Sequence, residues 1–144
     1  MALPEGTLAP QIETVDQDGK RVQLDFQGVT VLYFYPKDDT PGCTVEACSF
    51  RDDLSEFARR GVNVYGVSTD DSASHKKFAQ KYGLNFALLA DPEKKIAQAY
   101  GVLSEQGYAQ RVTFVMKDGV IVKVFPKVSP NGHSREVLQA LDEL

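Results

Sequence analysis

The fold is decided by one stretch of sequence: Tyr35-Pro36-Lys37-Asp38-Asp39-Thr40-Pro41-Gly42-Cys43-Thr44-Val45-Glu46-Ala47-Cys48-Ser49-Phe50. It follows the most apolar strand-like run of the chain, opens the first long helical pattern and contains both cysteines. Thr40 and Pro41 form a helix start, because threonine can cap a helix and proline suits the first helical position. Cys43 is therefore predicted to lie in the first turn of a helix.

This position predicts that Cys43 is a nucleophile. The N–H groups of the first turn and the helix macrodipole stabilise negative charge, so a thiol there ionises more readily than a free thiol. The thiolate is the nucleophilic form of cysteine. The alternative is that Cys43 and Cys48 are small, buried core residues, as free cysteines often are.

The spacing of the two cysteines restricts how they can pair. Residues five apart in an α-helix have Cα atoms roughly 8–9 Å apart, whereas a disulfide needs less than about 7 Å. Cys43 and Cys48 can therefore both be helical or be bonded to each other, but a disulfide requires the start of the helix to unwind. Cys48 lies off the apolar stripe that is predicted to face the core, which consists of Cys43, Ala47, Phe50, Leu54 and Phe57.

Composition limits the possible functions. The chain of 144 residues is 42% hydrophobic, which predicts a single domain over residues 1–144 with a real core. The net charge of −4 without a basic run argues against a nucleic-acid or anionic-membrane partner. No secretory signal or transmembrane run is apparent. Two cysteines are too few for a secreted disulfide scaffold, and in a reducing compartment such a pair is more often catalytic or redox-active than structural. We expect a cytoplasmic protein that is a monomer.

The quoted stretch joins two predicted strands. Val29–Tyr35 is a near-continuous β-branched and aromatic run, which is typical of a strand that is buried on both faces. The helix from about Pro41 to Arg60 is expected to end at Gly61. Val62–Ser68 is a second buried strand, so the three elements form a βαβ unit with parallel strands.

The rest of the chain completes an α/β sandwich. Asp118-Gly119 between two β runs is a strong hairpin signal. The patterns predict, in order, a small hairpin within residues 1–28, a helix from residues 69–73 to about Tyr82, a strand over Phe86–Leu89, a helix from the Asp91 cap to about Tyr100, strands over Arg111–Met116 and Val120–Phe125, and a last helix over Ser134–Leu144.

The motif Pro36-x-x-x-Thr40-x-x-Cys43 resembles the active-site signature of the peroxiredoxins. With Glu46 and Cys48 the run resembles the bacterioferritin comigratory protein branch, also called peroxiredoxin Q, and the likeness continues through Gly66-Val67-Ser68 and Leu88-Leu89-Ala90-Asp91-Pro92. The resemblance implies a thioredoxin-like fold, in which helices flank a central mixed sheet that is preceded by a β-hairpin. It implies no metal or organic cofactor.

The resemblance also implies a reaction. Cys43 attacks a peroxide oxygen and becomes a sulfenic acid, with release of an alcohol or water. Cys48 then condenses with it to an intramolecular disulfide, which a thioredoxin-like dithiol reduces. The expected substrates are hydrogen peroxide and small organic hydroperoxides. Two other functions stay open: a general thiol-disulfide oxidoreductase, which usually carries Cys-x-x-Cys, and a non-enzymatic interaction domain with buried cysteines.

Four further residues are candidates for the site. The Thr40 hydroxyl can cap the helix, and it can also meet the peroxide or the sulfur. Pro36 could shield the sulfur from water, or simply end the strand. Arg111, in the context Arg111-x-Thr113-Phe114, resembles the peroxiredoxin arginine that faces the cysteine; the alternative is a surface arginine. Glu46 either orients an arginine or is a solvated helix carboxylate.

Histidines and tyrosines are not assigned to the chemistry. His75 is expected to be solvated among lysines, and His133 to belong to a helix entry. The two histidines and the two cysteines do not match any compact zinc spacing. Tyr33, Tyr35 and Tyr100 are predicted to be core aromatics.

Overall fold

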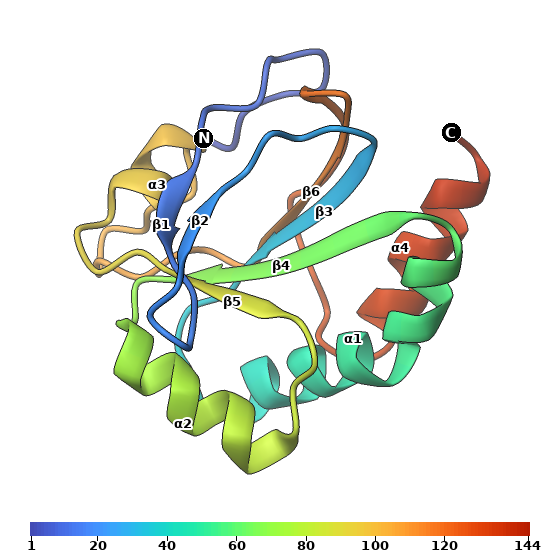
Figure 1. The fold of residues 1–144 in the computed structure, drawn as a ribbon. Coiled ribbons are helices and arrows are strands. Elements are labelled where there is room, and N and C mark those ends of the chain that lie inside the picture. The colour runs from blue at the N-terminus through green and yellow to red at the C-terminus, as the bar shows by residue number, and fades with distance from the viewer.

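A computed structural model describes residues 1–144, which form a five-stranded mixed sheet and a separate two-stranded hairpin (Figure 1). The order of the large sheet is β5-β4-β3-β6-β7. The strands are β1 Glu13–Val15, β2 Arg21–Gln23, β3 Val29–Phe34, β4 Val62–Ser68, β5 Ala87–Ala90, β6 Val112–Lys117 and β7 Val120–Phe125. The helices are α1 Pro41–Arg59, α2 Ser72–Tyr82, α3 Lys95–Ala99 and α4 His133–Asp142.

The central strand β3 is buried on both faces, as its apolar run predicts. It pairs with β4 in parallel and with β6 in antiparallel orientation. The predicted βαβ unit is therefore confirmed. Gly66 of β4 lies beside Tyr33, and a Cβ at this glycine would come within 2.9 Å of the Tyr33 ring. The glycine thus makes room for an aromatic side chain in the middle of the sheet.

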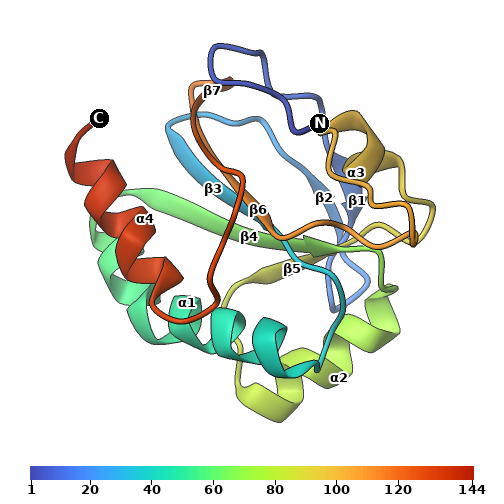
Figure 2. The same ribbon diagram turned by 180° about the vertical axis from the view of Figure 1, so that it is seen from behind.

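Alternation along β3 sends neighbouring side chains to two separate cores. Tyr33 and Tyr35 join a cluster with Cys43 and Phe50 beneath α1, α2 and α4. Leu32 and Phe34 join a cluster on the other face, with Tyr100 and other residues of the α3 region and the N-terminal segment. Figure 2 shows these two layers on opposite sides of the sheet. The predicted core positions of the three tyrosines are confirmed, since all three are fully buried.

Turn residues behave mostly as predicted. Asp118 and Gly119 have φ values of 50° and 86°, as the tight hairpin between β6 and β7 requires. Gly61, at φ 71°, follows α1 as expected. The helix predicted from Asp91 is wrong in its start, because residues 91–94 form a turn and α3 begins at Lys95. The Asp91 carboxylate instead accepts hydrogen bonds from the Ile96 and Ala97 backbone N–H groups.

None of the helices combines the length and the apolar character that crossing a membrane would require.

Candidate active site

Cys43 is the third residue of α1, just beyond the end of the central strand β3. Its side chain is 1% exposed, and Cys48 is half-buried. Helix α1 is continuous through both positions, and both thiols are free. Of the two arrangements that the cysteine spacing allows, the structure therefore has the one in which both residues are helical and unbonded.

Thr40 occupies the N-cap position of α1, but its hydroxyl does not cap the helix. Its backbone is extended, with φ −100° and ψ 157°, and its carbonyl accepts the first helical hydrogen bond from the Thr44 N–H at 2.8 Å. The hydroxyl donates instead to the Lys37 carbonyl at 2.9 Å. The predicted capping bond is thus wrong. The N-terminus of α1 therefore has no side-chain cap from Thr40.

Arg111 reaches across from the residue before β6 and contacts two residues of α1. Its Nη2 donates to the Cys43 sulfur at 3.3 Å, and its Nη1 donates to Glu46 Oε1 at 2.7 Å. Arg111 is therefore not a free surface residue. The guanidinium therefore places a positive charge directly against the sulfur.

Glu46 is fully buried, so the alternative of a solvated carboxylate is wrong. Burial raises the pKa of Glu46 to about 7, although the charge and hydrogen bond of Arg111 act in the opposite direction. Burial of Arg111 acts to lower the pKa of its guanidinium, but Glu46 and Cys43 raise that pKa by more. Arg111 therefore stays charged between the carboxyl group and the sulfur.

Gly42 allows the guanidinium to lie directly against the first turn of α1. A Cβ at this residue would lie 3.1 Å from Arg111 Nη2 and 3.4 Å from the ring of Pro130. Pro130 belongs to the loop between β7 and α4, and no pattern in the sequence pointed to it. Pro36 is half-buried where β3 has ended, in the loop that leads to α1.

Tyr33 lies in the core cluster that contains Cys43. Its ring stacks on Phe50 with centroids 4.6 Å apart. Burial raises the pKa of Tyr33 well above its ordinary value, and the charges of Glu46 and Cys43 raise it further. The Tyr33 hydroxyl and Glu46 Oε2 are both buried without a hydrogen-bond partner. Sequence patterns assigned Tyr33 only to the core.

His75 is fully buried, so its predicted solvation is wrong. It precedes Phe78 by three residues and shares the inner face of α2 with it. Its Nδ1 lies 2.7 Å from Asp38 Oδ2, and its Nε2 lies 2.9 Å from the Leu89 carbonyl. Asp38, Asp70 and His75 could in principle ligate a metal. However, both nitrogens of His75 are already engaged by protein oxygens.

His133 begins α4, as the predicted helix entry implies, and is also buried. Its Nε2 lies 2.7 Å from the Thr113 hydroxyl, and its Nδ1 lies 2.9 Å from the Glu136 carboxylate. Burial lowers the pKa of His133, and the Glu136 carboxylate opposes this shift. The contact with Thr113 links α4 to β6. Thr113 lies two residues after Arg111 in the sequence.

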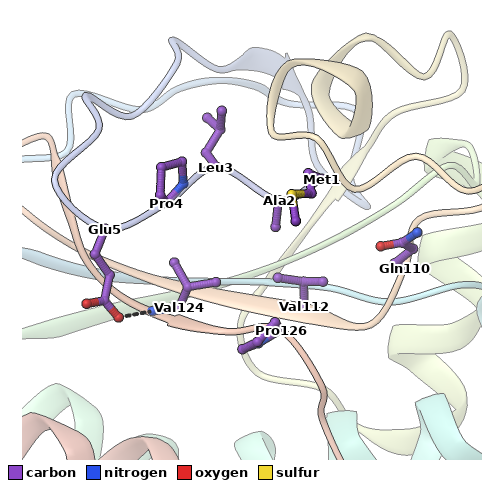
Figure 3. A pocket seen from close by; sticks show the side chains of 9 residues that line it. All are labelled: Met1, Ala2, Leu3, Pro4, Glu5, Gln110, Val112, Val124 and Pro126. Atoms are coloured by element: carbon purple, nitrogen blue, oxygen red, sulfur yellow. Dashed lines mark hydrogen bonds between the residues drawn. The ribbon is translucent and has the colours of Figure 1, made fainter.

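A groove of about 790 Å³ lies apart from Cys43, between the N-terminal segment and strands β6 and β7 (Figure 3). Its lining residues include Gln110 and Val112, which flank Arg111. None of the candidate site residues lines this groove.

These features define a class of protein: a thiol enzyme on a mixed α/β fold, with its cysteine at a helix N-terminus beside a buried arginine–carboxylate pair. Residues 6–124 match the AhpC/TSA family. The chain is 42% identical to peroxiredoxin Bcp of Escherichia coli (strain K12), covering 98% of this chain and 97% of that protein. It is 44% identical to the chloroplastic peroxiredoxin Q of Suaeda salsa, covering 97% of this chain and 68% of that protein.

A solved structure of the Xanthomonas campestris bacterioferritin comigratory protein, studied for its alkyl peroxide reduction activity, superposes with a TM-score of 0.86 at 33% identity. The match covers 92% of this chain and 90% of that one. The chain belongs to the AhpC/TSA family, within its Bcp and peroxiredoxin Q branch. It is a thiol-dependent peroxidase with a thioredoxin-like fold.

Proposed function

We propose that Cys43 is the residue that attacks the peroxide and that Arg111 assists it. The observation that carries this proposal is the 3.3 Å contact between Arg111 Nη2 and the Cys43 sulfur. The thiolate attacks one oxygen of the hydroperoxide, the O–O bond breaks, and the second oxygen leaves as an alkoxide or hydroxide that takes up a proton. Arg111 stabilises the charge that develops on the leaving oxygen, and Glu46 holds Arg111 in place.

Thr40 and Pro36 complete the proposed site. The Thr40 hydroxyl has lone pairs beyond its bond to the Lys37 carbonyl, so it can accept a hydrogen bond from the peroxide. Pro36 lies in the same loop and has no N–H group, so it limits the access of water to the sulfur.

Cys48 is the proposed resolving residue. Since helical geometry separates residues five apart by more than a disulfide allows, α1 unwinds from Thr40 to about Phe50 before the bond forms. The thiol of Cys48 attacks the sulfur of the sulfenic acid and water is released. A thioredoxin-like dithiol then reduces the disulfide and is itself oxidised.

The proposed substrates are hydrogen peroxide and small organic hydroperoxides, in line with the alkyl peroxide reduction described for the Xanthomonas campestris relative. Residues 1–144 would act as one domain and as a monomer. A dithiol reductant is available in reducing compartments, so we place the activity in the cytoplasm. A general disulfide oxidoreductase would usually carry a shorter cysteine spacing and would not need an arginine at its sulfur.

A single-turnover experiment tests this function. Reduced protein is mixed with one equivalent of hydrogen peroxide, without a reductant, and the product is identified by mass. We expect consumption of the peroxide and an intramolecular disulfide. Cys48→Ser should consume one equivalent and stop as the sulfenic acid.

The matched variant Cys43→Ser should consume no peroxide, because serine is a far weaker nucleophile than a thiolate. Peroxide consumption by Cys43→Ser at the wild-type rate would refute the assignment of Cys43.

A further inference from the structure

The loop that carries Thr40 into α1 is attached to the core through one side chain. Among Pro36–Thr40, only Asp38 is buried, with 7% of its surface exposed. The Tyr35 hydroxyl donates to Asp38 Oδ1 at 2.6 Å, and the Ser74 hydroxyl donates to Oδ2 at 2.8 Å. The Asp38 N–H donates to Asp70 Oδ2 at 2.8 Å. Asp38 thus joins this loop to the ends of β3 and β4 and to α2.

His75 is the fully buried partner of this carboxylate. The Leu89 carbonyl can only accept a hydrogen bond, so Nε2 of His75 carries a hydrogen. His75 Nδ1 lies 2.7 Å from Asp38 Oδ2, and both side chains are buried. The geometry therefore describes a buried hydrogen-bonded pair that extends from the active-site loop to β5. Removing one member of such a pair leaves the other polar group buried without its partner, which is strongly unfavourable.

Asp39 gives the same loop a second attachment, which is weaker. Asp39 accepts from Lys81 Nζ at 2.9 Å and from the Tyr82 hydroxyl at 2.8 Å, at the far end of α2. Both side chains of the ion pair are exposed, at 58% and 42%, and solvent screens such contacts. The position of the loop thus depends mainly on the pair formed by Asp38 and His75.

We propose that Asp38 and His75 are positioning residues of the peroxidase. Together they fix the Pro36–Thr40 loop, so that Thr40 and the first turn of α1 face the peroxide. They also stop the unwinding of α1 that precedes the disulfide from extending toward the N-terminal side of this loop; we call this position the upstream limit of the unwinding. This inference rests on the proposed function of Cys43 and Cys48. Loss of the pair lets the unwinding spread toward Tyr35, which disfavours the conformation that attacks peroxide and favours the one that forms the disulfide.

Two rate constants, measured separately in full-length protein, test this role. One is sulfenic acid formation and the other is conversion of the sulfenic acid to the disulfide, both followed by rapid quenching and mass analysis. In His75→Leu, we expect the first to fall about tenfold and the second to rise about tenfold, the effect of one lost charge-assisted hydrogen bond on a local opening equilibrium. His75→Asn keeps a donor near Asp38 and should stay within about threefold of wild type.

The matched control is Tyr100→Phe. It removes a buried hydrogen bond to the Pro10 carbonyl in the other core cluster, on the opposite face of the sheet. Its two rate constants should stay at wild-type values. Rate changes that are equal in His75→Leu and Tyr100→Phe, or that are absent from His75→Leu, would overturn the proposal.

A measurement on the unmodified protein does not depend on whether a variant folds. Nitrogen NMR of the His75 imidazole should show a hydrogen-bonded ring with the same signals in the reduced and the disulfide form. A change to the signals of a solvated imidazole upon oxidation would contradict the upstream limit.

If wild-type protein forms no sulfenic acid, the proposed function fails instead. Amide exchange at Lys37–Thr40 in reduced His75→Leu still tests the attachment of the loop. It should exceed the exchange in Tyr100→Phe, and equal exchange would exclude the positioning role.

Discussion

At the scale of single residues, Cys43 contacts an arginine that also binds a buried acid. Arg111 lies 2.7 Å from Glu46 Oε1 and 3.3 Å from the Cys43 sulfur. In the proposed mechanism, the carboxyl group orients the guanidinium, and the guanidinium places positive charge beside the sulfur and the leaving oxygen. Two residues of α1 and the residue that precedes β6 would then act as a unit.

Arg111→Ala is expected to slow the peroxide step by roughly 10²–10³, the usual loss for one donor that stabilises developing charge. Stopped-flow kinetics of reduced protein with hydrogen peroxide measure this step. Arg59→Ala is the matched control, because Arg59 is an exposed arginine of α1 that pairs with Glu56. Equal rates for Arg111→Ala and Arg59→Ala would remove Arg111 from the site.

Glu46 makes the stability of the protein depend on pH in a definite direction. Burial raises the pKa of Glu46 from its ordinary value of 4.5 to about 7. The folded protein therefore holds this proton at pH values where the unfolded chain has lost it. The stabilisation is complete below about pH 4.5 and is lost as the pH rises through about 7, with a total change of about 3 kcal/mol.

In Glu46→Gln, the free energy of unfolding should not show this fall as the pH rises. Denaturant unfolding at pH 5 and pH 8 measures the free energy of unfolding of both proteins, and the difference between them cancels the other carboxylates. A fall of the same size in Glu46→Gln would assign the pH dependence to other groups.

At the scale of elements, the proposed cycle makes two demands on α1. Its first turn is helical when Cys43 attacks the peroxide, and it unwinds so that the sulfur can reach Cys48. The side chains of the first turns are only partly suited to the core, because Cys43, Glu46 and Ala47 are buried while Val45 is exposed. Phe50 and Phe57 hold the remainder of the helix on the sheet. The start of α1 therefore packs on the core through small and polar side chains, whereas aromatic rings hold its later turns.

Oxidation by one equivalent of peroxide should raise amide hydrogen exchange in residues 40–50. The central strand β3 should keep its protection, because its hydrogen bonds to β4 and β6 do not involve α1. Mass-resolved exchange of peptic peptides measures both segments. Cys48→Ser is the control, since it forms sulfenic acid without a disulfide and should keep a protected helix; unchanged exchange in oxidised wild-type protein would exclude the unwinding.

At the scale of the whole molecule, the sheet separates two apolar cores with different polar content. One core contains Cys43 and Tyr33, and the other surrounds Tyr100. The Tyr100 hydroxyl donates to the Pro10 carbonyl at 2.7 Å, whereas the Tyr33 hydroxyl is buried without a partner. The same chemical group therefore contributes differently to stability in the two cores.

Tyr33→Phe should leave the free energy of unfolding unchanged or raise it, because no hydrogen bond is lost. Tyr100→Phe should lower it by about 1 kcal/mol, the typical net value of one hydrogen bond. Thermal and denaturant unfolding of the two variants form the comparison. A loss of stability in Tyr33→Phe larger than that in Tyr100→Phe would show that the Tyr33 hydroxyl has a partner.

Much of the architecture was determined by the sequence alone. Short-range chemistry is enough to predict these elements. Apolar runs indicate the strand at residues 29–34 and its parallel partner strand. A proline at the first helical position indicates the helix that follows Thr40, and residues that accept positive φ indicate the Asp118-Gly119 hairpin. Cys43 in the first turn of α1 follows from the same local signals, as does its separation from Cys48 along a continuous helix.

Other features depended on the tertiary structure, because each of them involves residues far apart in the chain. Arg111 meets Cys43 across 68 positions through the antiparallel pairing of β3 with β6. The burial of His75 depends on Asp38 and Leu89, which lie on other elements. Local pattern determines which element forms, whereas long-range packing determines which polar groups meet and lose their water.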